Sequence, residues 1–386
     1  MERKSLIARS NGVRAENAGP PLGIRAIDFF CGAGGLTRGL TDSGITVRAG
    51  IDNDARLRTT YERNNKGSKF LDLDINEVDI DQLRQELGIT PQDVVLYAAC
   101  TPCQPFSTLN QRRGKDDRKD LLLAFGKLVV EAPPDYVVVE NVPGLPNAYG
   151  KDIYAKFTAM LKKAGLVYQD SALVDASDYG VPQIRKRFIL VASRHGPISL
   201  PSPDQGEKAT VRQAIEHFRQ PYLGPHRPRS RSAVSSLVPE EESAAMPANH
   251  VARKLAPHLL RIVANVPKDG GSRGDITNDD ILLDCHKRAP KLHRDVFGRM
   301  TWDAPAPTLT CRCTDVYCGR FAHPVDDRGI SLREAAALQT FPDDYVFYGT
   351  FLHGAAQIGN AVPVQLAARL GSTFVASERD RVGQTR

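Results

Sequence analysis

The sequence predicts an α/β protein, in which helices cover both faces of a mostly parallel β-sheet and a smaller, irregular region is attached. Two observations lead to this prediction. Over residues 24–200, short apolar runs of strand length alternate with longer stretches of helical texture, as in sheets built from strand–helix–strand units. After residue 200 the chain becomes rich in Pro, Ser and Arg, with no sustained period.

Each predicted strand is a short run rich in Val, Ile and other apolar residues, bounded by polar or turn-forming residues. The five runs are Ile24–Phe30, Val47–Ile51, Val94–Ala98, Tyr136–Glu140 and Arg187–Ala192. Helical stretches lie between or after them at Gly35–Ser43, Ala55–Asn64, Leu121–Glu131, Ile153–Ala164 and Ser331–Thr340, with a further one after Val362.

Changes of texture divide the 386 residues into five segments. A polar lead-in (1–23) is followed by the main α/β unit (24–200) and an inserted region (201–320). We expect residues 321–377 to return to the main unit and 378–386 to form a tail. Residues 201–300 carry 16 Lys and Arg against 12 Asp and Glu, which leaves +4 of the net +6 there. This excess fits a nucleic-acid-facing module, with a flexible solvated insertion as the alternative.

Composition excludes several classes of protein. A hydrophobic content of 41% and a charged content of 25% are ordinary for globular proteins and exclude a mostly disordered chain. No apolar run approaches the roughly 18 residues of a membrane span. The first 21 residues lack the apolar stretch of a secretion signal, and seven scattered cysteines fit a reducing compartment. We therefore expect a cytoplasmic protein.

The first chemical motif is a strand that runs into a Gly-rich turn, Ala26-Ile-Asp-Phe-Phe-Cys-Gly-Ala-Gly-Gly35. Such a turn lets a ligand approach the backbone closely, although a plain tight turn has the same composition. Asp52 ends the next strand, where a carboxylate can accept both ribose hydroxyls of a nucleoside cofactor; alone, it would be a turn or capping aspartate. Asp74 is placed to meet an adenine amino group. The cofactor candidates here are Asp28, Phe30, Gly32, Gly34, Gly35, Asp52, Asn53, Asp74 and Ile75.

A second motif, Ala98-Ala-Cys-Thr-Pro-Cys-Gln-Pro-Phe-Ser107, follows the strand Val94–Ala98 and therefore lies at the same edge of the sheet. Its Cys-x-x-Cys spacing is compatible with redox or zinc chemistry, but no second such pair completes a zinc site, and we expect no metal. A cysteine that follows a proline on a loop is better explained as a nucleophile, which points to Cys103.

The segment Pro102-Cys103-Gln104, with Phe106-Ser107, resembles the catalytic loop of the DNA (cytosine-5) methyltransferases. Six other segments, in residues 24–200 and 295–375, resemble further motifs of that family and occur in the same order along the chain. They are Asp28–Gly35, Asp52 with Thr60-Tyr61 and Asn64, Glu140-Asn141-Val142, Gly180–Arg187, Arg333-Glu334 through Phe341-Pro342, and Gln357–Pro363. The chain departs from the family pattern in having Ala-Cys-Thr-Pro where Gly-Gly-Pro-Pro is usual. It also has Asp52 where glutamate is commoner.

The resemblance implies a Rossmann-like methyltransferase fold and S-adenosylmethionine as methyl donor, with Pro102, Asn360 and Val362 added to the cofactor site. The thiolate of Cys103 would add to C6 of a cytosine flipped out of duplex DNA. Glu140 would stabilise the charge that develops at N3, and Asn141 would hold the loop and contact the base edge. Arg187 would bind the cytosine O2, and Arg185 would support the backbone. Each of these residues, taken alone, has an ordinary structural explanation.

The resemblance further implies that residues 24–200 form the catalytic and cofactor-binding domain and 201–320 a target-recognition domain. The expected partner is double-stranded DNA, bound by a monomer. The expected biological role is restriction–modification or phage defence, in which a restriction endonuclease would be functionally paired with the methyltransferase. Two alternatives stay open: a tRNA cytosine-5 methyltransferase, and a catalytically silent DNA-binding relative.

Overall fold

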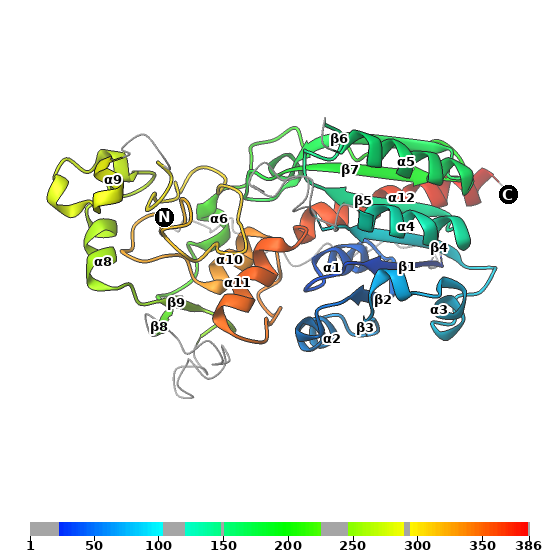
Figure 1. The fold of residues 1–386 in the computed structure, drawn as a ribbon, viewed down its shortest axis with the longest axis horizontal. Coiled ribbons are helices and arrows are strands. Elements are labelled where there is room, and N and C mark those ends of the chain that lie inside the picture. Colours follow the sequence, from blue (N-terminus) through cyan, green and yellow to red (C-terminus); the bar gives the residue numbers. More distant parts are fainter. Residues whose placement is uncertain (1–22, 103–119, 148–149, 225–245, 289–293, 385–386) are drawn as a thin grey trace, which may run out of the picture.

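The computed structural model describes residues 23–102, 120–147, 150–224, 246–288 and 294–384. The predicted nucleophile Cys103 and nearly all of the lead-in lie outside these residues. Figure 1 shows two lobes, one built on a β-sheet and one of short helices and loops. No helix of the described residues is long and apolar enough to cross a membrane.

A seven-stranded sheet forms the first lobe, in the order β3-β2-β1-β4-β5-β7-β6. Strands β1 to β5 pair in parallel, whereas β7 runs antiparallel to both β5 and β6, so the prediction of a mostly parallel sheet is confirmed. The strands are β1 (Ile24–Phe29), β2 (Thr46–Asp52), β3 (Lys69–Asp72), β4 (Val94–Cys100), β5 (Tyr136–Asn141), β6 (Tyr168–Asp175) and β7 (Lys186–Ser193).

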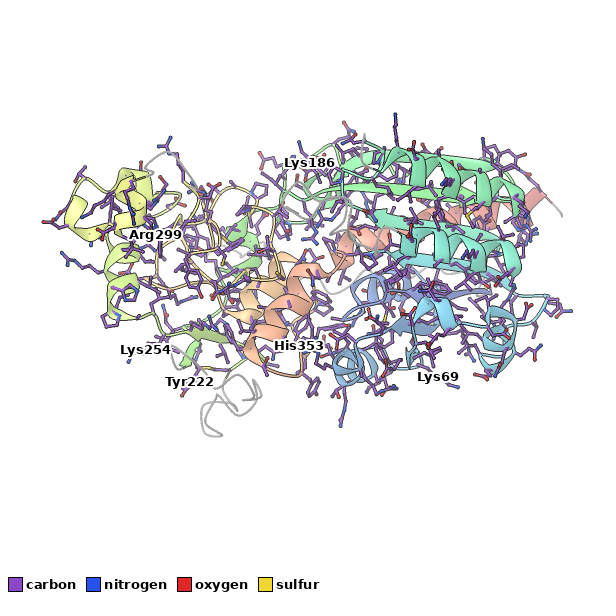
Figure 2. All side chains as sticks on the ribbon, viewed as in Figure 1. Lys69, Lys186, Tyr222, Lys254, Arg299 and His353 are labelled. Carbon is purple, nitrogen blue, oxygen red and sulfur yellow. The ribbon has the colours of Figure 1, made fainter. Side chains whose placement is uncertain are left out.

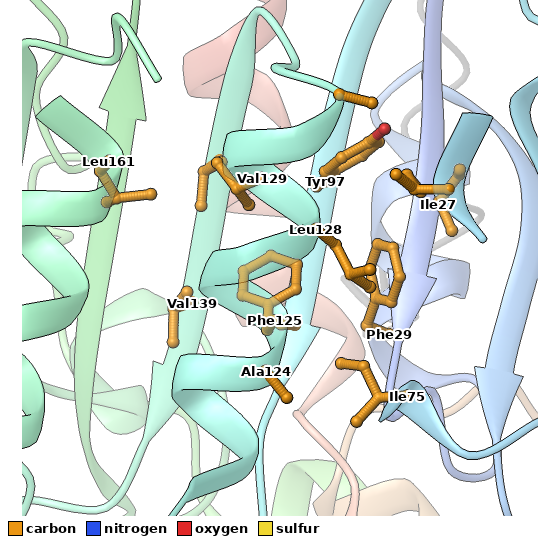
Figure 3. Close-up of a cluster of buried hydrophobic side chains, with 14 of the residues drawn as sticks. Ile27, Phe29, Ile75, Tyr97, Ala124, Phe125, Leu128, Val129, Val139 and Leu161 are labelled. Carbon is orange, nitrogen blue, oxygen red and sulfur yellow. The ribbon is translucent and has the colours of Figure 1, made fainter. Parts of the chain in front are cut away.

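Helices cover both faces of this sheet. One face packs against α3 (Ile80–Glu86), α4 (Leu121–Glu131) and α5 (Lys151–Lys163) in a core that includes the neighbouring rings of Phe29 and Phe125, which are tilted by 57° (Figure 3). The other face packs against α1 (Gly35–Asp42) and α12 (Val364–Gln384). The short α2 (Arg58–Asn64) lies beside β3 at the end of the sheet (Figure 1).

The second lobe holds a two-stranded parallel ribbon and five short helices in its described part. These are β8 (Tyr222–Gly224), β9 (Val251–Arg253), α6 (Val211–Ile215), α8 (Pro257–Ala264), α9 (Asp284–Arg288), α10 (Leu332–Leu338) and α11 (Phe351–Asn360). The fully buried Arg299 (Figure 2) holds this lobe together, because its guanidinium donates to the carbonyls of Val263, Val266 and His323.

The predicted C-terminal segment 321–377 is divided between the lobes. Helices α10 and α11 share a buried core with residues of 211–330 in the second lobe. Helix α12 instead packs along α1, where a side chain on Gly39 would lie 2.4 Å from Cβ of Ala367. The chain therefore completes the second lobe before it returns to the sheet.

Candidate active site

The turn between β1 and α1, which we call the cofactor turn (residues 28–35), has an unusual backbone. Phe30, Gly32 and Gly34 all have positive φ, at 59°, 56° and 93°. A side chain on Gly34 would lie 2.5 Å from Nδ2 of Asn65, and one on Gly35 would lie 2.4 Å from the carbonyl oxygen of Val362. Gly32 instead has no atom within 4 Å of the place where a Cβ would point. Neighbouring residues therefore pack closely against Gly34 and Gly35, whereas the space next to Gly32 is free. A ligand could approach the backbone of the turn there.

Asp52, at the end of β2, lies directly against this turn. Its Oδ2 accepts the N–H of Gly32 at 3.0 Å, and its Oδ1 accepts the N–H of Asp54 at 3.0 Å. Burial raises the pKa of Asp52, and the two backbone donors oppose that rise. The neighbouring Asn53 is exposed. Asp52 is therefore a fixed carboxylate at the mouth of the open turn.

Asp28, beneath the turn, is completely buried. Its Oδ2 accepts a hydrogen bond from Thr37 Oγ1 at 2.7 Å, while its Oδ1 has no hydrogen-bond partner. Thr37 Oγ1 also lies 2.9 Å from the Tyr61 hydroxyl, which continues to Ser68. Burial raises the pKa of Asp28 to about 7. A buried carboxyl oxygen without a donor is costly, and it is the kind of group that a cationic ligand would compensate.

The third strand brings Asp74 to the same edge of the sheet. Beta-strand β3 pairs with β2 so that Asp72 opposes Asp52, and the N–H of Leu73 bonds to the carbonyl of Asp52. Asp74 caps the short turn that follows by accepting the N–H and side-chain amide of Asn76. Ile75 is buried in the sheet core.

The carboxyl ends of β4 and β5 carry the second group of predicted residues. Glu140 is only 4% exposed, and its Oε1 lies 2.8 Å from Nε of Arg187. The adjacent Asn141 is fully buried and donates to Oγ1 of Thr101 at 2.6 Å. Thr101 directly precedes the half-buried Pro102. Asn141 thus anchors the first residues of the loop that leads to the predicted nucleophile.

Arg185 and Arg187 differ sharply in their surroundings. Arg185 is buried and donates to the carbonyls of Leu309, Gly359 and Ala361, so it ties the sheet lobe to the second lobe. Arg187 is partly exposed and forms the ion pair with Glu140. The structure therefore places Arg187 against the carboxyl group of Glu140.

The two C-terminal candidates for the cofactor site are Asn360, the last residue of α11, and Val362, which lies between α11 and α12. Asn360 is exposed. Val362 is buried, and its carbonyl closes over Gly35 at the start of α1. The structure thus brings Val362 against the cofactor turn.

The sequence patterns missed Tyr345, which holds the cofactor turn from outside, and the partner that Asn64 meets, although Asn64 itself lies in a predicted motif. Tyr345, from the second lobe, donates its hydroxyl to the carbonyl of Ala33 at 2.5 Å and accepts from Nδ2 of Asn65 at 3.0 Å. Asn64 exchanges two hydrogen bonds of 2.8 Å with the backbone of Val346. These contacts join residues that are 280 to 312 positions apart in the chain, so no local sequence pattern predicts them. Burial and desolvation hold the pKa of Tyr345 well above its ordinary value.

Comparison with known proteins agrees with this arrangement. The profile of the family described as C-5 cytosine-specific DNA methylase matches residues 24–376. The chain belongs to that family. It is 37% identical over 348 residues to the Type II methylase M.HgiDII of Herpetosiphon aurantiacus, an alignment that covers 88% of this chain and 92% of that protein. It is 30% identical to the Type II methyltransferase M.XorII of Xanthomonas oryzae pv. oryzae, over 94% of this chain and 86% of the relative.

The fold of this methylase also has solved counterparts. A prophage-encoded protein of E. coli, described as a DNA modification methyltransferase, superposes with a TM-score of 0.71 at 22% identity, over 92% of this chain and 99% of that one. The predicted α/β methyltransferase fold is confirmed. Family membership identifies the chain as a DNA (cytosine-5) methyltransferase and implies the use of S-adenosylmethionine. Among the described residues, no cluster of His, Cys, Asp or Glu is arranged to hold a metal ion.

Proposed function

We propose that this enzyme methylates C5 of a cytosine flipped out of a specific duplex sequence, through a covalent bond between Cys103 and C6. One observation carries the proposal: the buried Glu140 is paired with Arg187 at the sheet edge, beside the anchored start of the Cys103 loop. A carboxyl group and a guanidinium at that edge match the hydrogen-bonding pattern of N3 and O2 on a cytosine ring.

The cofactor turn supports S-adenosylmethionine as the methyl donor. The residues that would hold it are the open Gly32, Asp52 for the ribose hydroxyls and Asp74 for the adenine amino group, with Phe30, Asn53, Ile75, Pro102, Asn360 and Val362 around them. The unpartnered Oδ1 of Asp28 fits a cationic ligand. Bound there, the cofactor supplies an electrophilic methyl group on a sulfonium centre.

The protein's own residues would act on the base. Cytosine C5 is a poor nucleophile, so addition of the Cys103 thiolate to C6 is needed to convert the ring to an enamine. Electron density then moves onto N3, where Glu140 supplies or shares a proton. Arg187 forms an ion pair with Oε1 of Glu140. Its positive charge would bind the cytosine O2. Once C5 carries the methyl group and has lost its proton to solvent, elimination breaks the bond between Cys103 and C6. This step returns the thiolate and leaves 5-methylcytosine in the DNA strand.

The wider setting follows from the relatives. Proteins named as Type II methylases suggest a role in restriction–modification or phage defence, with a functionally paired endonuclease. The second lobe, residues 201–320 above all, would read the target in the major groove, with phosphate contacts from its Lys and Arg. We further propose that the enzyme acts as a monomer in the cytoplasm.

A single substitution tests the central step. Cys103→Ser is expected to abolish methyl transfer to duplex DNA while leaving cofactor affinity unchanged, because the serine hydroxyl is far less nucleophilic than a thiolate. Tritiated methyl transfer measures the first effect and equilibrium dialysis the second. Wild-type enzyme should also form a denaturation-resistant adduct with 5-fluorocytosine DNA, and Cys103→Ser should not. Full activity of the serine variant would refute the assignment of the nucleophile.

A further inference from the structure

A second cysteine, Cys100, lies against the catalytic carboxyl. Strands β4 and β5 are parallel, and their register pairs Cys100 with Glu140 at the carboxyl ends of both strands. Neighbouring positions in register project to the same face of a sheet. Sγ of Cys100 accordingly lies 2.9 Å from Oε2 of Glu140.

Glu140 is thereby held from two sides. Its Oε2 accepts from the Cys100 thiol, and its Oε1 accepts from Nε of Arg187 at 2.8 Å. The two donors come from β4 and β7, which flank β5 on opposite sides of the sheet. The terminal torsion of a glutamate is intrinsically soft, so a single donor would leave the carboxyl plane free to rotate. Two donors on opposite flanks fix it.

We propose that Cys100 is a positioning residue for the methyl-transfer reaction, acting through Glu140. Its S–H bond orients the carboxyl group so that the proton that Glu140 supplies to or shares with N3 is directed at the ring nitrogen of the target base. The thiol keeps its proton throughout and forms no covalent bond. This inference rests on the proposed role of Glu140 in stabilising charge at N3.

In the sequence, too, position 100 departs from the pattern of the family. Cys100 stands in the Ala-Cys-Thr-Pro segment, where the family pattern more often has Gly-Gly-Pro-Pro. A glycine at this position has no side chain to offer the carboxyl group. Here, by contrast, the thiol donates directly to a side chain that is only 4% exposed, where an added donor has a larger effect than in water.

Three substitutions separate hydrogen bonding from packing. Cys100→Ala removes the donor and some volume, Cys100→Val fills the space without a donor, and Cys100→Ser keeps a donor in a smaller side chain. We expect kcat for methyl transfer to fall roughly tenfold in the alanine and valine variants, the usual effect of losing one hydrogen bond to a charged group. Cys100→Ser should stay within about threefold of wild type.

The other measurements identify where the effect arises. The KM for duplex DNA and the dissociation constant of S-adenosylmethionine should be unchanged in all three variants, because the thiol acts through its hydrogen bond to Glu140, which is not among the proposed cofactor-binding residues. Two results would overturn the proposal: alanine and valine variants with wild-type kcat, or a serine variant as impaired as alanine. If the alanine variant does not fold, the comparison of valine with serine decides the question alone.

Failure of the proposed function is distinguishable from failure of this inference. Trapping on 5-fluorocytosine DNA reports the Cys103 adduct in wild-type enzyme whatever the role of Cys100. Absence of that adduct would refute the covalent mechanism. An adduct in wild type, together with equal kcat in the four proteins, would refute only the role of Cys100.

Discussion

The buried carboxyl of Asp28 makes a quantitative prediction about stability. Asp28 is fully buried, it accepts one hydrogen bond from Thr37, and its second oxygen has no partner. Desolvation raises its pKa from 3.8 to about 7 in the folded protein. Replacement by asparagine keeps an acceptor for Thr37 but removes the ionisable group. The stability difference between Asp28→Asn and wild type should therefore depend on pH.

The sign follows from proton binding. Because folded Asp28 holds its proton more tightly than the unfolded chain does, the folded state binds more protons between about pH 4 and pH 7, and wild-type stability falls as the pH rises through that interval. Above about pH 8 the loss is essentially complete and constant. Each unit of pKa difference between the unfolded and folded states corresponds to about 1.4 kcal/mol of unfolding free energy. A rise from 3.8 to about 7 therefore costs about 4 kcal/mol in full. Of this, about 2.5 kcal/mol accrues between pH 5 and pH 8.

Urea unfolding of ligand-free protein, followed by far-UV circular dichroism at pH 5, 6, 7 and 8, measures this effect. Relative to wild type, Asp28→Asn should gain about 2.5 kcal/mol of unfolding free energy between pH 5 and pH 8, whatever its stability at pH 5. Asp42→Asn is the matched control, because Asp42 is an aspartate on α1 whose side chain is exposed. A difference that is independent of pH would refute the assignment of a raised pKa to Asp28.

Three further predictions concern backbone and interlobe contacts. Gly34→Ala places a Cβ 2.5 Å from Nδ2 of Asn65 at a φ of 93° and should lower unfolding free energy by about 2–4 kcal/mol, measured in urea. Asn64→Ala leaves the backbone of Val346 without its two side-chain partners and should lower it by about 1–3 kcal/mol; an unchanged urea midpoint would contradict this. Arg299→Met strips donors from several carbonyls in the second lobe and should weaken DNA binding in a mobility-shift assay while cofactor affinity is retained.

Much of the fold was predictable because its signals are local. The five predicted strands and the helix Leu121–Glu131 appear in the structure with boundaries that agree within two residues. Beta-strand β6 escaped prediction, because it is the edge strand and leaves Leu173 55% exposed, so no apolar run marks it. Helix α11 was also missed, since two glycines and several small residues weaken its helical pattern.

In the candidate active site, too, the local features were predictable from the sequence and the contacts between distant residues were not. Spacing along the chain points to Asp28, Asp52 and Glu140 at strand ends, and the structure brings Asp28 and Asp52 to the cofactor turn through local strand–turn–helix geometry. Arg187 was predicted to meet a cytosine oxygen, and in the structure it is also the ion-pair partner of Glu140. That pairing depends on β7 running antiparallel beside β5, which no sequence period encodes.

The sequence alone determined the class of fold, the edge of the sheet that carries chemistry and the residue types gathered there, because strand ends and Gly-rich turns leave local patterns. Only the tertiary structure decided which side chains meet. Cys100 reaches Glu140 through the register of two strands 40 residues apart, and Tyr345 reaches the cofactor turn from another lobe. Register and lobe docking are set by the packing of the whole core, so they become visible only when the chain is folded.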